Sequence, residues 1–254
     1  MSDGIEVVAI PREDPIALEL LVGVRGGDVE RVRDLVAANP DLARARFVGR
    51  GGSSGALHFV TDWPGYFPKG PDIVKVLVNA GADPNALTTG GGSLTPGPGS
   101  ETPLHYAASS DDVEVAAALI DAGADLEMTG GSIGTPLDNA VGYACWNVAR
   151  LLVARGAKVD QLWHAGALGI LDRLEELLGT KQDPQRISQA FWHACGAGQR
   201  RAAERLLNAG ADLDWEPDYA HGTALEAATG RGTQQNNVIA WLQSIGAHSS
   251  QAST

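Results

Sequence analysis

The sequence predicts an all-α solenoid of about seven helix-turn-helix repeats joined by short hairpin-like loops. The first observation behind this prediction is the segment Thr102-Pro103-Leu104-His105, which returns as Thr135-Pro136-Leu137-Asp138 after 33 residues. The second is the segment of residues 120–125, echoed by residues 153–158 after the same interval. A fixed period of this length is typical of solenoids in which each repeat contributes one pair of helices.

Each residue of the repeated motif has a physical reason to be there. Thr102 and Thr135 can cap a helix with their side-chain oxygens, and the proline that follows occupies the first turn, where no backbone donor is needed. Gly123 and Gly156 end the second helix of their repeats, where a left-handed backbone favours glycine. On these residues the chain resembles the ankyrin-repeat family, whose period is 33 residues; the composition, rich in arginine, alanine and glycine, fits a bacterial member.

The resemblance covers residues 15–247, which we predict to be a single solenoid domain between an N-terminal extension, residues 1–14, and a C-terminal tail, residues 248–254. In the third repeat, apolar residues of the segment 113–120 fall on one helical face. The first, fifth and seventh repeats match the pattern weakly. The seven helix pairs are predicted at residues 20–38, 56–85, 102–125, 135–158, 162–178, 191–212 and 223–247.

Composition and charge exclude several classes of function. The 254 residues carry a net charge of −12, which disfavours binding to nucleic acids and to anionic membranes. No apolar stretch is long enough to span a bilayer, and the N-terminus lacks the features of a signal peptide. Cys145 and Cys195 are too few for a disulfide framework. We therefore expect a cytoplasmic protein, a monomer or weak dimer, with no metal and no cofactor.

An insertion in the second repeat departs from the pattern. Residues 61–71 replace a tight turn with a segment that carries Trp63, Tyr66, Phe67 and three prolines. Proline rigidity lowers the entropic cost of holding aromatic side chains in place. Two interpretations stay open: a loop that contacts a ligand, and a surface loop folded over its own repeat with Trp63 in a private core.

Glycine-rich and acidic segments between the repeats are interpreted as loops. Residues 88–100 predict an elongated finger, either a passive loop or a mobile flap, and residues 48–55 a shorter example. Residues 214–222 alternate carboxylates with aromatic residues, Tyr219 among them, and predict an exposed hairpin tip or a recognition tip.

Matched Trp-His pairs mark the fifth and sixth repeats. Trp163-His164 and Trp192-His193 stand where the third repeat has His105 and its successor. The resemblance implies that His58 and His105 hydrogen-bond between neighbouring loops. The two tryptophans are expected in the core, and the two following histidines either pack there or bracket a ligand in a groove.

The resemblance also implies where a partner binds, because ankyrin proteins use hairpin tips and two residues before the inner turn of each repeat. Those pairs are Arg25-Gly26, Asp62-Trp63, Ser109-Ser110, Gly142-Tyr143, Ala167-Leu168, Gly196-Ala197 and Gly230-Arg231. Asp62, Trp63, Ser109, Ser110 and Tyr143 should converge in one polar and aromatic groove.

Two functions follow from this groove. The first is recognition of a protein partner through the concave groove and the loop tips. The alternative is binding of a small organic ligand, or cofactor-independent catalysis by a lyase, isomerase or hydrolase, with Asp62, His164 or His193 as the acid or base. The residues predicted for binding are Asp62, Trp63, Tyr66, Ser109, Ser110, Tyr143, Trp163, His164, Trp192, His193 and Tyr219.

Overall fold

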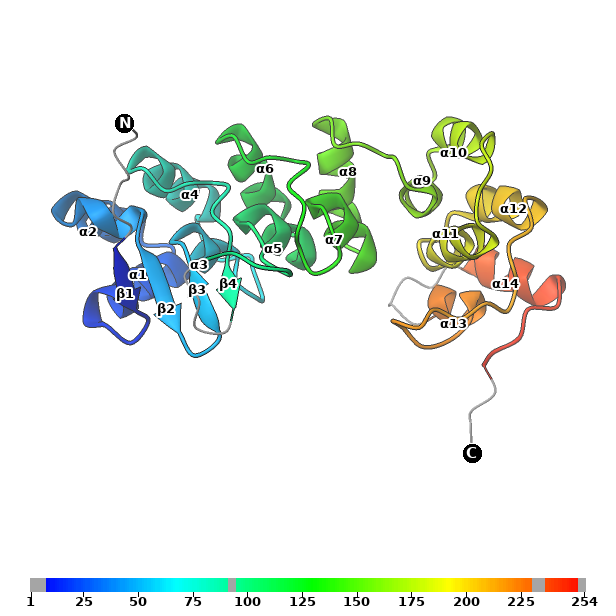
Figure 1. Ribbon diagram of the computed structural model, residues 1–254, viewed down its shortest axis with the longest axis horizontal. Coiled ribbons are helices and arrows are strands. Elements are labelled where there is room, and N and C mark those ends of the chain that lie inside the picture. The colour runs from blue at the N-terminus through cyan, green and yellow to red at the C-terminus, as the bar shows by residue number, and fades with distance from the viewer. Residues whose placement is uncertain (1–7, 91–94, 230–235, 251–254) are drawn as a thin grey trace. The chain divides into compact units, whose positions relative to one another are not determined.

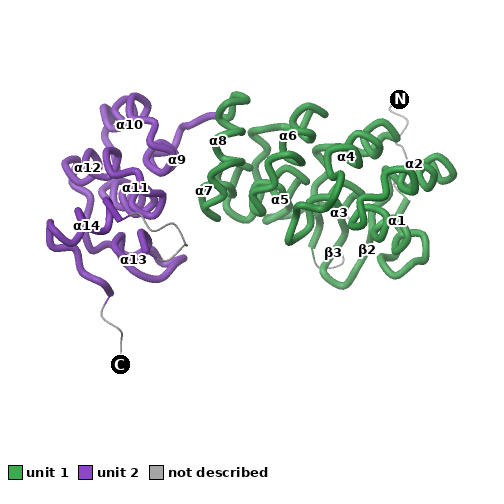
Figure 2. Tube along the Cα trace, turned by 180° about the vertical axis from the view of Figure 1, so that it is seen from behind, with its two compact units in different colours: residues 1–157 green, residues 158–254 purple. Residues whose placement is uncertain are grey.

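The computed structural model describes residues 8–90, 95–229 and 236–250. Two compact units divide the chain, residues 1–157 and residues 158–254 (Figure 2). Within the described ranges, fourteen α-helices form seven consecutive pairs, four in unit 1 and three in unit 2. This arrangement confirms the predicted solenoid of helix-turn-helix repeats, while the prediction of a single domain stays a prediction.

Unit 1 stacks its four helix pairs in two rows (Figure 1). The inner row packs α1 on α3, α3 on α5 and α5 on α7, and the outer row packs α2 on α4, α4 on α6 and α6 on α8. The helices are α1 (Pro15–Gly26), α2 (Val29–Ala38), α3 (Leu57–Thr61), α4 (Gly70–Asn79), α5 (Pro103–Ser110), α6 (Val113–Asp121), α7 (Pro136–Gly142) and α8 (Trp146–Ala154), with a short 3₁₀ helix at Pro40–Ala43.

The repeated motif starts the inner helices α5 and α7 as predicted. Thr102 and Thr135 cap these helices, and each proline occupies the first turn. Asp138, which replaces the motif histidine, accepts hydrogen bonds from the backbone nitrogen and the hydroxyl of Thr135 at 2.6 and 2.8 Å. His105 Nε2 lies 3.0 Å from the carbonyl oxygen of Gly134, so this histidine joins its own repeat to the next loop.

The core of unit 1 lies between the two rows. Leu104 and Leu137 are 0% and 1% exposed, and small alanines beside them let the helices approach closely. Leu77 and Leu119 fill the outer row in the same way. Because each repeat covers the apolar face of its neighbour, the stack has one continuous core.

A small sheet covers one edge of unit 1 and was not predicted. Its strands β1 (Ala9–Pro11), β2 (Arg46–Gly49), β3 (Gly52–Ser54) and β4 (Thr89–Gly90) pair in that order, with β1 parallel to β2 and the other pairs antiparallel. The interpretation of residues 48–55 as a passive loop is therefore wrong, and the finger of residues 88–100 begins in a strand. Ser53 and Thr89 join the two segments by a 2.8 Å bond between their hydroxyls.

Unit 2 repeats the same scheme with three helix pairs. The inner helix α11 packs on α9 and α13, and the outer helix α12 packs on α10. Phe191 and Leu206, both nearly inaccessible, anchor its core. The helices are α9 (Leu162–Leu168), α10 (Leu171–Leu178), α11 (Pro184–Gly196), α12 (Arg200–Asn208), α13 (Ala224–Thr229) and α14 (Asn236–Ser244).

Candidate binding site

The insertion of the second repeat reaches across to the third. The backbone nitrogen of Tyr66 donates to Asp112 Oδ2 at 2.7 Å, and the Tyr66 hydroxyl donates to the carbonyl oxygen of Asp111. Gly65 has a φ of +75°, and a Cβ there would lie 3.0 Å from Ser110 Oγ. These contacts fix the loop on the inner turn of the third repeat rather than over its own repeat.

The Trp63 side chain does not pack into a small hydrophobic core within the insertion. Its side chain is 81% exposed, and its backbone nitrogen donates to Asp62 Oδ1 at 3.0 Å. Tyr66 and Tyr143 are also exposed, by 63% and 51%. The interpretation of the insertion as a loop folded around its own aromatic core is therefore wrong for Trp63.

The recognition positions of three successive repeats converge on one open hollow of about 280 Å³. As the period predicted, Asp62 and Trp63 come from the second repeat, Ser109 and Ser110 from the third, and Tyr143 from the fourth. The complete lining consists of Thr61, Asp62, Trp63, Glu101, Tyr106, Ser109, Ser110 and Tyr143. Tyr66 lies in the same loop but does not line the hollow.

Glu101 and Tyr106 line the hollow and were missed by the sequence analysis. Glu101 Oε1 accepts hydrogen bonds from Asn139 Nδ2 at 2.8 Å and from Ser132 Oγ at 2.8 Å. Asn139 Nδ2 also donates to Ser109 Oγ at 3.2 Å. The 33-residue period could have predicted that Tyr106 and Asn139 lie near the hollow, because they occupy equivalent positions, each two residues after the motif leucine.

Two carboxylates, those of Asp62 and Glu101, line the hollow and determine its electrostatics. Asp62 Oδ2 forms an ion pair of 2.7 Å with Arg25 Nη2, and the Arg25 guanidinium lies 5.5 Å from the centre of the Phe67 ring. Burial raises the pKa of Tyr106, and the charges of Glu101 and Asp62 raise that pKa further. The Tyr106 hydroxyl therefore stays protonated and can donate a hydrogen bond. The ion pair between Asp62 and Arg25 joins the start of the insertion to the first repeat.

The Trp-His pairs form a separate aromatic cluster within unit 2. The Trp163 ring centre lies 4.5 Å from that of His164 and 4.9 Å from that of His193. Both histidines are buried, with exposed fractions of 2% and 5%. The Trp163 ring thus contacts both imidazoles, an arrangement that favours packing; that these histidines bracket a ligand stays a prediction.

Tyr219 joins this cluster to the tip of residues 214–222. Its hydroxyl lies 3.1 Å from His193 Nε2 and accepts a hydrogen bond from Gln189 Nε2 at 3.2 Å. Trp192 is buried and donates from Nε1 to the carbonyl oxygen of Gly222 at 3.0 Å. A hollow of about 360 Å³ in the same unit includes Asp160, Trp163 and Gln189 in its lining. Trp192 is a core residue, as predicted.

Comparison with known proteins decides the family. Residues 66–162 match a family model described as ankyrin repeats (3 copies). The structure is similar to the human ASB11 ankyrin repeat domain, with a TM-score of 0.52 at 18% identity over 87% of this chain and 96% of that domain. The chain therefore contains ankyrin repeats.

Two curated relatives of this chain come from animals. The B-cell lymphoma 3 protein homolog of Mus musculus is 31% identical over 159 residues, which are 56% of this chain and 34% of the relative. The putative palmitoyltransferase ZDHHC13 of Danio rerio is 25% identical over 230 residues, which are 85% of this chain and 33% of the relative. The chain thus spans about a third of the length of the curated relatives it matches.

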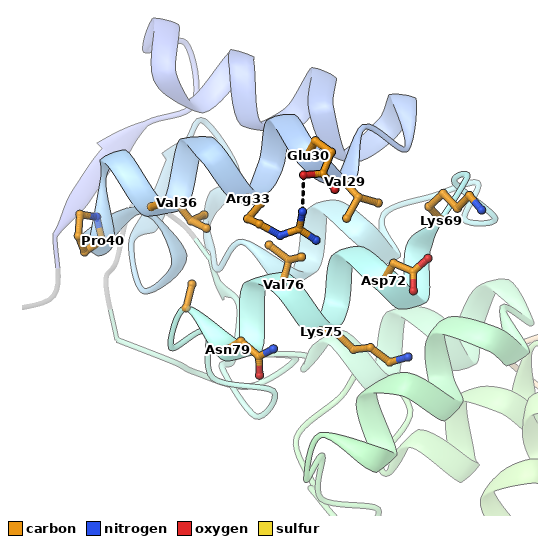
Figure 3. Close-up of a pocket in the computed structure, with 12 residues that line it drawn as sticks. Val29, Glu30, Arg33, Val36, Pro40, Lys69, Asp72, Lys75, Val76 and Asn79 are labelled. Atoms are coloured by element: carbon orange, nitrogen blue, oxygen red, sulfur yellow. Dashed lines mark hydrogen bonds and ion pairs between the residues drawn. The ribbon is translucent and has the colours of Figure 1, made fainter.

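A larger hollow of about 840 Å³ lies between the outer helices α2 and α4 of unit 1 (Figure 3). Val36 and Val76 form part of its lining, and Arg33 lies there in an ion pair with Glu30. A groove of this kind follows from the packing of neighbouring amphipathic helices. None of the residues predicted for binding lines it, whereas recognition positions of three repeats line the hollow of about 280 Å³.

The remaining predictions concern a recognition pair, membranes and metals. Gly230 and Arg231, the recognition pair of the seventh repeat, lie outside the described residues. Across residues 8–90, 95–229 and 236–250, no helix combines the length and the apolar character needed to cross a membrane. The same residues contain no group of three or more histidine, cysteine, aspartate or glutamate side chains placed to hold a metal ion.

Proposed function

We propose that this protein binds a segment of a partner protein at the hollow of about 280 Å³ in unit 1, in contact with Trp63 and Tyr143. Ankyrin repeats are generally protein–protein interaction modules, and the matched residues 66–162 include the third and fourth repeats, which contribute Ser109, Ser110 and Tyr143 to the hollow. The observation that supports the proposal most is the exposure of Trp63, Tyr66 and Tyr143 at and beside the recognition positions. Large exposed aromatic side chains are enriched at the centres of protein interfaces.

The polar lining of the hollow supports the same function. The Tyr106 hydroxyl, the Ser109 hydroxyl and the partly exposed Glu101 carboxylate lie among the aromatic side chains. An apolar surface with a few oriented polar atoms fixes the register of a bound chain, since each buried polar group of the partner needs a hydrogen bond. We therefore expect a partner segment that brings an apolar side chain and at least one hydrogen-bond donor.

The alternative, a small-molecule site or a cofactor-independent enzyme, is less well supported. The hollow of about 280 Å³ is open and lies just below the roughly 300 Å³ at which ligand pockets begin. Asp62, its candidate acid or base, is held in the ion pair with Arg25. The geometry therefore favours a shallow protein contact over a closed pocket.

Quantitative affinity capture tests the proposal. The full chain, immobilised, would be compared with the double variant Trp63→Ala/Tyr143→Ala in a lysate of the source organism, followed by titration of the captured partner in purified form. Truncation of two central aromatic residues should weaken a direct interface by about 2–4 kcal/mol, a loss of roughly thirtyfold or more. The matched control is Leu18→Ala/Val22→Ala, which removes exposed apolar side chains from α1.

Selective loss of affinity in the aromatic variant would support the proposal. Equal affinity of the two variants for the purified partner, with circular dichroism showing both folded, would contradict it. If the α1 variant alone lost the partner, binding would lie on the exposed side of the first repeat instead.

A further inference from the structure

A second hollow in unit 1, of about 270 Å³, has a positively charged lining. It lies against the end of the β2–β3 hairpin, and its lining includes Arg12, Arg50, Ser54, Thr88 and Tyr106. No aspartate or glutamate lines it, whereas the hollows of about 840, 360 and 280 Å³ each include at least one carboxylate. In a chain with a net charge of −12, such a lining indicates a local preference for anions.

Arg12 is held in place by neutral groups only. Its Nη2 donates to Ser54 Oγ at 2.7 Å, and its guanidinium carbon lies 5.7 Å from the centre of the Phe59 ring. In the described part of the chain, no carboxylate lies within 4.0 Å of the side-chain nitrogens of Arg12 or Arg50. A guanidinium has five N–H donors, so most of those on Arg12 stay available for a ligand.

Arg46 adds a third guanidinium to the same sheet. It donates to Ser53 Oγ at 2.9 and 3.1 Å and to the Ser53 carbonyl oxygen at 3.2 Å. Burial, together with the weaker effect of the charges of Arg46 and Arg12, lowers the pKa of His58 to about 4. Among the residues that the structure describes, the arginines of the sheet therefore have no carboxylate within 4.0 Å, and they lie next to a buried histidine that stays neutral.

The donors around the hollow are suited to a tetrahedral oxyanion. Two guanidinium groups and three hydroxyls, those of Ser54, Thr88 and Tyr106, belong to four separate segments of the chain. Phosphoryl groups offer several charged oxygens in different directions, and arginine binds them with charge-assisted hydrogen bonds. The volume of about 270 Å³ exceeds that of one water, about 30 Å³, roughly ninefold, so an organic substituent can enter with the anion.

We propose that this hollow binds the phosphoryl group of a phosphate monoester through Arg12 and Arg50, with hydrogen bonds from the Ser54, Thr88 and Tyr106 hydroxyls. The site is distinct from the partner-binding hollow, although Tyr106 lines both.

Calorimetric titration of the full chain with inorganic phosphate tests this assignment. At constant ionic strength in chloride buffer, one saturable site per chain is expected. Arg12→Gln and Arg50→Gln should each weaken phosphate binding by about tenfold or more, since each removes a charge-assisted contact. The matched control Arg33→Gln removes a guanidinium that is paired with Glu30 on the outer helix α2 and should leave phosphate affinity unchanged.

Further variants and other anions test whether phosphate binds at this hollow. Arg50 makes no side-chain hydrogen bond within the described ranges, so Arg50→Gln tests the site without disturbing the sheet. The variant Trp63→Ala should keep phosphate binding, which would distinguish this site from the partner site. O-phosphoserine should bind at least as tightly as inorganic phosphate, and acetate more weakly. Equal phosphate binding by Arg50→Gln and Arg33→Gln, no saturable site, or acetate binding as tight as that of phosphate would overturn the proposal.

Discussion

Two buried histidines join neighbouring loops in unit 1, and each uses both ring nitrogens to do so. His58 accepts from the backbone nitrogen of Gly55 at 3.2 Å through Nδ1, and its Nε2 lies 3.0 Å from the carbonyl oxygen of Glu101. His105 makes the equivalent contact to the loop before α7. A neutral imidazole can donate from one nitrogen and accept at the other, so these contacts require the uncharged form.

Acid should therefore destabilise the fold before the carboxylates titrate. Burial lowers the pKa of His58 to about 4 and also lowers the pKa of His105. Between about pH 6.5 and 4 the unfolded chain binds protons that the native chain does not, so the free energy of unfolding falls as pH is lowered, by about 3 kcal/mol for His58. Guanidinium unfolding at several pH values measures this slope.

The variant His58→Gln should flatten the slope, because glutamine does not titrate. The exposed His221 supplies the control, and His221→Gln should leave the slope unchanged. An unchanged slope in His58→Gln would show that this histidine is not buried in the neutral form.

The leucines of the repeated motif are expected to carry much of the stability. Leu104 and Leu137 are buried between layers, so Leu104→Ala or Leu137→Ala should lower the free energy of unfolding by about 2–5 kcal/mol. Leu18, 46% exposed on α1, is the control, and Leu18→Ala should change stability by less than about 0.5 kcal/mol. A loss below about 0.5 kcal/mol at both buried positions would contradict the packing between repeats.

At the scale of elements, the helices were predictable and the sheet was not. The motif at Thr102 and Thr135 contains its own cap, first-turn proline and buried leucine, so local sequence determines where α5 and α7 begin. The strands β3 and β4 pair Ser53 with Thr89, 36 residues apart, and neither strand is long enough to show alternation. Glycine in both segments also favoured a loop interpretation.

The candidate site was predictable where it follows the period and not where it depends on side-chain contacts. The convergence of Trp63, Ser109 and Tyr143 follows from equivalent positions in stacked repeats. The ion pair between Asp62 and Arg25 joins residues 37 apart, and no local pattern marks such a pair. The spacing of the repeats predicts which backbone positions lie side by side. Which residue forms an ion pair with a charged side chain also depends on the rotamer of that side chain.

Gly52 tests the pairing of β3 with β4. Its φ is +129°, and a Cβ would lie 1.7 Å from the carbonyl oxygen of Thr89. Gly52→Ala should therefore separate the strands and lower the free energy of unfolding by about 1–3 kcal/mol. A Cβ on Gly51 would meet no atom within 4 Å, so Gly51→Ala is the control, expected within about 0.5 kcal/mol of wild type. Equal stability of both variants would contradict the observed β3–β4 contact.

At the scale of the whole molecule, the negative net charge disfavours binding to polyanions such as DNA. With 31 acidic and 19 basic side chains, the chain should repel the phosphate backbone of DNA. No gel shift of duplex DNA is expected at physiological salt, even though the arginines of the sheet form a local positive site. A strong shift that is independent of sequence would contradict this prediction.

The central claim is that the face around Trp63 contacts a partner protein, and site-specific photo-crosslinking tests it most directly. A benzophenone amino acid would replace Trp63 in one full-length variant and Val22, 62% exposed on α1, in another. Illumination in a lysate of the source organism should give a covalent adduct with one protein from position 63 and none from position 22. Adducts of equal yield from both positions, or an adduct from position 22 alone, would contradict the claim.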